Sequence, residues 1–400
     1  MDLTKADEPT ARNRKTVGGH LLPLDGVRGL AILMVIMSHA FESNYEHGNV
    51  AVRIVGALLS YGYFGVDLFF VLSGFLITGI LFDSLKDDGY FRKFYARRAL
   101  RIFPLYYGVL ITCLLLTRPL HLHWNGMGWL LAFYLQNLRP MEIMTFSPGT
   151  WVALYHFWSL AVEEQFYLVW PAVVFLMRGK RRVLVATLVG SAGALILRVG
   201  LLLGGASPFA MHVTMVCRAD SLLLGGTFAM LYRSWVWTRV EEFARWGFVG
   251  AAAVLVSSIL LIEPKLLAYP RLNTLWMSGG RYTLLAVGFS FLVAWSLQEG
   301  SLCKRLFERS WLRFLGKYSY GLYVLHVLVL TVMNLRLRAE LLRLTHSRMI
   351  AVVGAGAMSL VLSIVAAYVS YHLYERPFLR LKHRFDYSRM TLNHGSPEDA

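Results

Sequence analysis

Long apolar segments alternate with short polar segments along almost the whole chain. The apolar segments are 16 to 24 residues long, and a helix needs about 20 apolar residues to cross a bilayer. The pattern therefore predicts ten membrane-spanning helices, over residues 24–41, 62–82, 100–117, 157–177, 183–203, 209–232, 246–262, 282–297, 311–333 and 350–373. A shorter apolar segment, 127–138, is predicted to be a half-helix or a re-entrant segment.

The composition agrees with an all-α, polytopic membrane protein. Of the 400 residues, 56% are hydrophobic and only 16% are charged, and the mean hydropathy is +0.51. The net charge of +16 could suggest a nucleic acid as a partner. However, the Lys and Arg residues lie in the segments between the apolar spans, which is typical of loops next to a membrane. We therefore expect membrane lipid, and no nucleic acid, as a partner.

The distribution of basic residues predicts the topology. With the N-terminus in the cytoplasm, the inside segments carry 27 Lys and Arg residues and the outside segments carry 10. The first ~20 residues lack the features of a cleaved secretory signal, so the first span is expected to remain in the protein. We predict a multi-pass protein of the plasma membrane with a cytoplasmic tail (1–23), a transmembrane domain (24–375) and a second cytoplasmic tail (376–400).

The first span carries two ionisable side chains at a helical spacing. Arg28 and His39 are eleven residues apart, almost three helical turns, so they share one face at a separation of about 16 Å. Asp25 precedes Arg28 by three residues and can pair with it. Ionisable groups are costly in lipid, and they therefore indicate a cavity or a buried contact. The alternative is an ordinary buried ion pair and a core histidine.

Four spans bring His or carboxylate side chains to a similar predicted depth, near the external surface. These are His39, Asp67, the pair Glu163 and Glu164, and His326. A histidine beside a carboxylate can take a proton from a hydroxyl group as a general base. The sequence leaves open which of the three carboxylates orients His39. It also leaves open whether His326 belongs to the site or to the core.

The predicted cytoplasmic side is rich in arginine instead. Arg98 and Arg101 share a face at a spacing of three residues, and Arg28 adds a third guanidinium at that depth. Arginine binds phosphate through two parallel hydrogen bonds, so a phosphorylated donor is expected there. The alternative is the usual basic flank of a membrane span.

Other polar residues in the spans have ordinary interpretations. Ser73, next to Gly74, is expected to allow close helix packing rather than to act as a nucleophile. Arg218 and Asp220 belong either to a tunnel or to a buried pair. Glu375 can pair with Arg376 or with a neighbouring loop. The His, Cys and carboxylate residues show no metal-ligand spacing, so no metal is expected.

Several of these segments, taken together, resemble the acyltransferase-3 family of membrane O-acyltransferases. The segments occur in the family's order and are LDGVRGLAILMVIMSHA, GVDLFFVLSGFLIT, FYARRALRIFPLYY, WSLAVEEQFYLVWP, CRADSLLLGG, LGKYSYGLYVLH and YERPF. The resemblance implies a ten-span enzyme. Such an enzyme takes an acyl group, usually acetyl, from cytoplasmic acyl-CoA and places it on a hydroxyl of a cell-surface glycan, a lipid-linked sugar or a secondary metabolite. Acyl-CoA is then a co-substrate, and no tightly bound cofactor is expected.

The resemblance also implies roles for individual residues. The family's Arg–x10–His pair corresponds to Arg28 and His39, its Arg-x-x-Arg to Arg98 and Arg101, and its glutamate to Glu163 or Glu164. The chain is expected to be the form without an added esterase-like domain. Two other interpretations remain open: a transporter of a polar or lipid-linked substrate with an intramembrane proton relay, and a scaffold in an envelope-polysaccharide assembly.

Overall fold

The computed structural model describes residues 21–41, 56, 59–119, 121–122, 124, 126–139, 154–262 and 270–387. In chain order its helices and helical turns are α2 (Leu22–Phe41), η1 (Tyr61–Phe64), α4 (Gly65–Asp83), α5 (Tyr90–Leu115), α6 (Met127–Ala132), η2 (Gln136–Leu138), η3 (Tyr155–Phe157), α8 (Trp158–Met177), α9 (Lys180–Leu203), α10 (Pro208–Val213), α11 (Met215–Tyr232), α12 (Trp237–Ser257), η4 (Ser258–Ile262), α14 (Pro270–Thr274), η5 (Leu275–Gly280), α15 (Arg281–Leu297), α16 (Leu302–Phe307), α17 (Ser310–Lys317), α18 (Ser319–Leu335), α19 (Leu337–Thr345), α20 (Arg348–Ser370), η6 (Tyr371–Glu375), α21 (Arg376–Arg380) and η7 (Leu381–Phe385).

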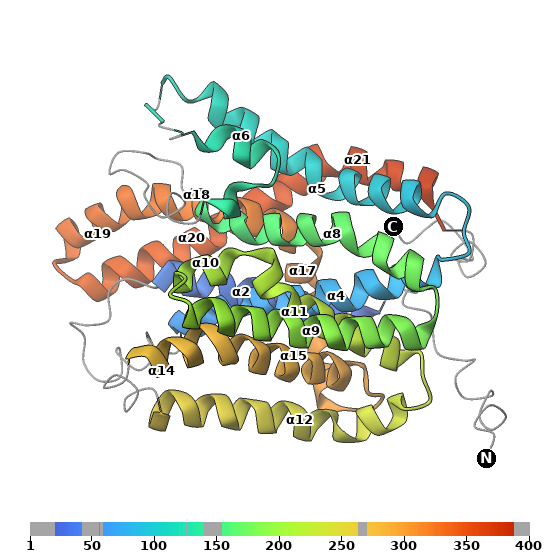
Figure 1. The fold of residues 1–400 in the computed structure, drawn as a ribbon. Helices are drawn as coiled ribbons and strands as arrows, with labels where there is room; N and C mark the ends of the chain where they lie inside the picture. The colour runs from blue at the N-terminus through green and yellow to red at the C-terminus, as the bar shows by residue number, and fades with distance from the viewer. Residues whose placement is uncertain are drawn as a thin grey trace, which may run out of the picture.

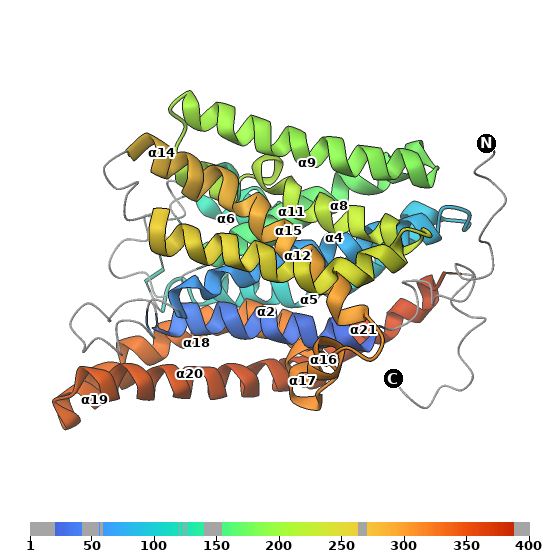
Figure 2. The ribbon, with the colours of Figure 1, turned by 90° about the horizontal axis from the view of Figure 1, so that it is seen from below.

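Among the described residues, nine helical stretches are long and apolar enough to cross a membrane. They correspond to nine of the ten predicted spans and confirm an all-α, polytopic membrane protein. The long helices lie side by side with their axes roughly aligned, as Figures 1 and 2 show. In the most apolar part of the stretch that contains α4, 72% of the residues are buried, so this helix is central. In the corresponding part of the stretch that contains α12, only 11% are buried, so this helix is peripheral. The exposed apolar side chains of such peripheral helices suit contact with lipid.

The sixth predicted span, 209–232, differs from the prediction. It is interrupted at Thr214, whose backbone is extended (φ −82°, ψ 130°), so that a short α10 precedes the 18-residue α11. Helix α11 is not among the nine candidate spans, and it carries Arg218 and Asp220. It packs closely against α4, where a Cβ on Gly74 would lie 1.7 Å from the carbonyl oxygen of Leu222. A helix with two charges is thus held inside the protein rather than against lipid.

The ninth predicted span, 311–333, is divided into α17 and α18. The division is at Tyr318 (φ −95°, ψ 7°). Helix α17 docks against the first turns of α2, because Gly316 and Gly29 let the two backbones approach each other. A Cβ on Gly316 would lie 1.8 Å from the carbonyl oxygen of Asp25, and a Cβ on Gly29 would lie 2.0 Å from that of Leu312. The contact places α17 beside the end of α2 that carries Arg28.

Helix α5 begins at Tyr90, ten residues before the predicted start, so Arg98 and Arg101 lie on the helix. The last membrane-crossing stretch runs from α20 into the π-helical turn η6, and then into α21 and η7. Segment η7 packs on α5, and Arg97 forms an ion pair with Asp386 there. The short segment 127–138 forms α6 and the turn η2.

Candidate active site

Two histidines meet at the end of the bundle where α2 ends. His39 is in the last turn of α2, and His326 is in α18, 287 residues away in the sequence. The Nε2 atom of His326 lies 3.2 Å from the Nδ1 atom of His39, and the ring centroids are 5.2 Å apart. His326 is fully buried, whereas His39 is partly exposed. The structure therefore brings together two of the predicted site residues.

The hydrogen bonds of this pair determine which ring nitrogen carries the proton. Nδ1 of His326 lies 3.0 Å from the carbonyl oxygen of Leu322 and 2.8 Å from that of Tyr323. A carbonyl oxygen can only accept, so Nδ1 of His326 must donate. Nε2 of the neutral His326 ring then accepts, and Nδ1 of His39 donates to it. The lone pair of His39 is therefore on Nε2, in the form that a general base requires.

Two further rings contact His326, and a serine bonds one of them. The ring of His156 lies 5.2 Å from that of His326, and the ring of Tyr323 lies 5.7 Å from it. The Tyr323 hydroxyl donates to the carbonyl oxygen of His156 at 2.9 Å and also bonds the hydroxyl of Ser159. None of these three residues was predicted from the sequence. One signal was available, because Tyr323 and Ser159 lie in the same two motifs that contain His326 and Glu163.

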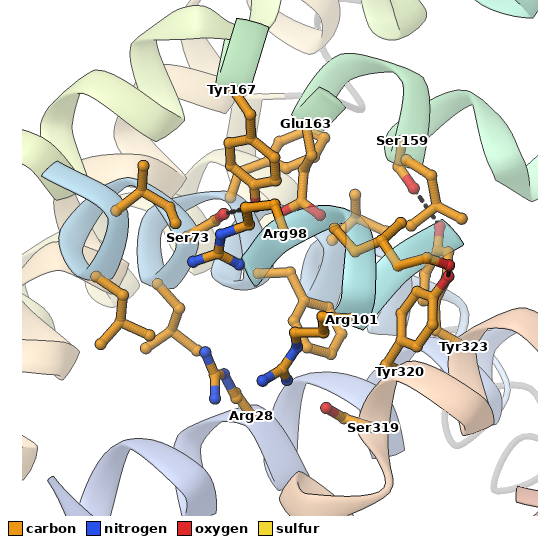
Figure 3. Close-up of a pocket in the computed structure, with 18 residues that line it drawn as sticks. Arg28, Ser73, Arg98, Arg101, Ser159, Glu163, Tyr167, Ser319, Tyr320 and Tyr323 are labelled. Atoms are coloured by element: carbon orange, nitrogen blue, oxygen red, sulfur yellow. Dashed lines mark hydrogen bonds between the residues drawn. The ribbon is translucent and has the colours of Figure 1, made fainter. Parts of the chain in front are cut away.

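A narrow cavity of about 100 Å³ is lined by the three arginines and also by Ser159 and Tyr323. Arg28, Arg98 and Arg101 lie toward one side of the close-up, and Ser159 and Tyr323 lie toward the other (Figure 3). Apolar side chains of α4 also line this cavity, namely Val66, Phe69, Phe70, Leu72, Leu76 and Ile77. We call this cavity the channel. Its arginine side is cationic, and its other side carries the hydroxyl groups of Ser159 and Tyr323.

The three arginines leave a positive potential at their end of the channel. Arg28 lies 3.7 Å from Asp25, and the guanidinium of Arg98 lies 5.1 Å from the centre of the Tyr167 ring. Within the described ranges, neither Arg98 nor Arg101 forms an ion pair with a carboxylate. Guanidinium groups held in this way can bind an anion such as phosphate.

The predicted carboxylate partners of His39 are positioned elsewhere. Asp67 accepts hydrogen bonds from Arg218 and, at 3.4 Å, from Ser221, deep in the bundle. Glu163 lines the channel with the arginines, next to Ser73 and Tyr167, which bond each other (Figure 3). The side chain that bonds His39 is thus His326, and not one of the predicted carboxylates.

Glu164 is on the same helix as Glu163, but it does not line the channel. Its Oε1 atom is buried and has no hydrogen-bond partner among the described residues. The contacts of these carboxylates could not be predicted from depth along the helix alone. Depth does not define which neighbour a side chain faces, and Asp67 pairs with Arg218.

The sequence left open whether Arg218 and Asp220 belong to a tunnel or to a buried pair, and the structure shows that each belongs to a buried ion pair. Arg198 donates to both oxygens of Asp220, at 3.1 and 2.8 Å, and Arg218 pairs with Asp67. All four side chains are at most 1% exposed. These contacts join α4, α9 and α11, and we assign them a structural role.

Glu375, at the end of η6, is buried and accepts a hydrogen bond of 2.9 Å from Ser370. Among the described residues, its hydrogen-bond partner is thus a serine of α20 rather than Arg376. In the part of the chain that the structure describes, no group of three or more His, Cys, Asp and Glu side chains could hold a metal ion. The expected absence of a metal stays a prediction.

Comparison with known proteins shows which family the chain belongs to. The family model described as an acyltransferase domain, Acyl_transf_3, matches residues 22–368. The chain is 26% identical over 331 residues to the peptidoglycan O-acetyltransferase of Listeria monocytogenes, an alignment covering 77% of this chain and 49% of that protein. No solved structure shows a significant match.

Two further relatives have related names. A Bacillus subtilis protein provisionally named a peptidoglycan O-acetyltransferase is 27% identical over 398 residues, covering 93% of this chain and 56% of that protein. A Staphylococcus aureus protein provisionally named an O-acetyltransferase is 27% identical, covering 77% and 50%. The chain spans about half the length of these curated relatives.

Proposed function

Because the chain belongs to the acyltransferase-3 family of membrane O-acyltransferases, we propose that it is an O-acetyltransferase of the plasma membrane with cytoplasmic termini. It moves an acetyl group from cytoplasmic acetyl-CoA to a hydroxyl of a cell-surface glycan on the external side. The names of the relatives, among them a peptidoglycan O-acetyltransferase, support this acceptor class. A lipid-linked sugar or a secondary metabolite with a free hydroxyl would meet the same chemical requirement.

One observation carries the proposal. Arg28 and His39 are on one continuous helix, α2, about 16 Å apart along its axis. Arg28 lines the channel at its cationic end, and Tyr323, at the other end, contacts His326, the partner of His39. A donor with a phosphorylated head and a long, slim thioester arm fits this arrangement. Its phosphates bind the arginines, and its arm extends through the apolar channel toward His39.

The transfer then uses the histidine pair. Nε2 of His39 removes the proton from the acceptor hydroxyl while the hydroxyl oxygen forms a bond to the thioester carbonyl carbon. The carbon–sulfur bond breaks, and the proton passes from His39 to the departing thiolate, which leaves as the free thiol of CoA. His326 accepts from Nδ1 of His39 throughout, so it keeps the correct nitrogen available and stabilises the imidazolium that forms.

The test compares His39→Ala with a matched control. Membranes containing the wild-type protein, His39→Ala or His346→Asn receive acetyl-labelled acetyl-CoA, and base-labile label is measured in the glycan, lipid and small-molecule fractions. His346 is exposed at the end of α19 with a positive φ of 52°, which asparagine accommodates. We expect label with the wild type and His346→Asn, and at least a 100-fold loss with His39→Ala, since general bases contribute about 10²–10⁴-fold.

Equal label with His39→Ala and with the wild type would remove His39 from the mechanism. If no variant transferred label while the protein moved a polar substrate across the membrane, the transporter interpretation would replace this proposal. Activity that survived the loss of both Arg28 and His39 would support the scaffold interpretation.

A further inference from the structure

A second, wider cavity lies at the end of the bundle where α2 begins. Its volume is about 740 Å³, within the range of about 300–1,000 Å³ that is typical of small-molecule sites. The residues that line it include Asp25, Arg28, Arg101, Arg313, Lys317, Tyr320, Glu375 and Lys382. We call it the basic vestibule.

The basic vestibule is strongly cationic. Five of its lining side chains are Arg or Lys, and two are carboxylates. Both carboxylates are already engaged: Asp25 lies 3.7 Å from Arg28, and Glu375 accepts from Ser370. The cations thus exceed what the local carboxylates can neutralise, and the site favours a ligand with several negative charges.

The basic side chains of the vestibule have few partners within the protein. In the described ranges, Arg101, Arg313, Lys317 and Lys382 form no ion pair with a carboxylate. The Nε atom of Arg313 is buried without a hydrogen-bond partner in the same ranges. A buried donor without an acceptor is unfavourable, so an incoming acceptor, such as a phosphate oxygen, would be favoured there.

The fold gathers the five basic side chains of the vestibule from four separate elements, α2, α5, α17 and η7. Helix α17, which carries Arg313 and Lys317, docks against the start of α2 through the close approach at Gly316. Lys382 is on η7, which packs along α5. The ion pair between Arg97 and Asp386 holds η7 in place. The vestibule is therefore formed by elements that pack against one another, and not by a cluster of loop residues.

The basic vestibule and the channel share three lining residues. Arg28, Arg101 and Tyr320 line both cavities, so the wide cationic space joins the narrow apolar one at these side chains. A volume of about 100 Å³ admits a slim chain, whereas the vestibule can hold a bulky, charged group. A wide cationic space that leads into a narrow apolar one matches a ligand with a polyphosphorylated head and a thin arm.

We propose that the basic vestibule binds the phosphorylated nucleotide end of the acyl donor, and that Arg313, Lys317 and Lys382 determine donor specificity. This inference rests on the proposed function, because it assigns the head of the donor whose acetyl group is transferred. It predicts selection for a thioester that carries a nucleotide with several phosphates over the same thioester arm without the nucleotide. Of these three residues, only Lys317 lies in a motif identified in the sequence, LGKYSYGLYVLH.

The first test compares two donors. The double variant Arg313→Gln/Lys317→Gln and the control Arg309→Gln/Arg384→Gln lose the same charge. Arg309 and Arg384 are exposed and do not line the vestibule. The donors are acetyl-CoA and S-acetylpantetheine, which has the arm without the nucleotide. For the vestibule variant we expect the KM for acetyl-CoA to rise at least about tenfold at nearly constant kcat, with an unchanged KM for S-acetylpantetheine.

The control variant should keep the wild-type KM for both donors. An equal change for both donors in the vestibule variant, or no change for either, would overturn the proposal while leaving acetyl transfer itself established. Size-exclusion elution and helical circular dichroism identical to those of the wild type would show that the glutamine variants are folded.

A second measurement does not depend on catalysis. Adenosine 3′,5′-bisphosphate is titrated into the purified full chain in detergent, and heat is recorded for the wild type, both double variants and Lys382→Gln. The wild type and the control should bind equally. The vestibule variant should bind at least about tenfold more weakly, and Lys382→Gln should also bind more weakly. Equal binding by all variants, or none by the wild type, would overturn the proposal. Variant-dependent binding without any transfer would support the vestibule while the proposed function failed.

Discussion

Replacing His326 by phenylalanine removes the acceptor that holds the ring of His39 in its productive form. Nδ1 of His39 donates to Nε2 of His326 across 3.2 Å, and this bond keeps the lone pair of His39 on Nε2. Phenylalanine fills a similar volume in a fully buried position but has no acceptor atom. Glutamine is the matched replacement, since its side-chain oxygen can still accept from His39.

The expected magnitude follows from the cost of the unmade bond. A buried donor that loses its acceptor costs about 1–3 kcal/mol, and each 1.4 kcal/mol is about tenfold. We therefore expect His326→Phe to lower kcat about tenfold to 100-fold, with little change in the KM for acetyl-CoA. The loss should be smaller than that for His39→Ala, because His39 itself takes the proton. His326→Gln should recover most of the lost kcat.

The assay is initial-rate acetyl transfer from acetyl-CoA with purified protein across a pH series, which separates kcat from KM. A structural role alone would lower the amount of folded protein without changing kcat per folded molecule. Full kcat in His326→Phe would refute the positioning role. A loss in His326→Gln as large as in His39→Ala would show that His326 reacts directly and is not a positioning residue.

Two further predictions concern the packing that supports the site. Asp67→Ala leaves Arg218 charged and buried, so the purified protein should lose about 3–5 kcal/mol of stability. A lowered Tm should be seen, and Asp67→Leu/Arg218→Met should restore much of it. Normal stability with lost activity in Asp67→Ala would instead give Asp67 a role in the reaction. Gly316→Ala places a Cβ 1.8 Å from the carbonyl oxygen of Asp25, so α17 should shift and the KM for acetyl-CoA should rise. Gly250→Ala, whose Cβ meets nothing within 4 Å, is the control, and equal KM values in the two variants would contradict this reasoning.

The features that the sequence predicted correctly depend on local geometry. The apolar segments predicted nine of the observed stretches, because a bilayer requires about 20 apolar residues in a helix. The relation between Arg28 and His39 was also predictable, since both residues lie in one helix whose period is fixed. Arg98 and Arg101, three residues apart on α5, share a face of that helix for the same reason, and both line the channel.

The partner of His39 could not be predicted in this way. His39 and His326 are 287 residues apart, and their contact depends on how α2 and α18 rotate against each other. The same limit explains Asp67, whose partner Arg218 is 151 residues away on α11. Apolar periodicity defines the lipid-facing side of a span, but it does not define which of several buried polar neighbours a side chain meets.

Helix α2 connects the two ends of the proposed reaction, and its packing explains why their separation is fixed. At one end Gly29 allows α17 to approach closely, and toward the other end Gly62 and Gly65 bring the start of α4 onto α2. A Cβ on Gly62 would lie 2.2 Å from the carbonyl oxygen of Met34, so α2 cannot slide without a backbone clash. The donor arm must therefore match the rigid distance along α2. This distance would select for the length of the arm between the phosphates and the thioester, whereas the basic vestibule would select for the nucleotide.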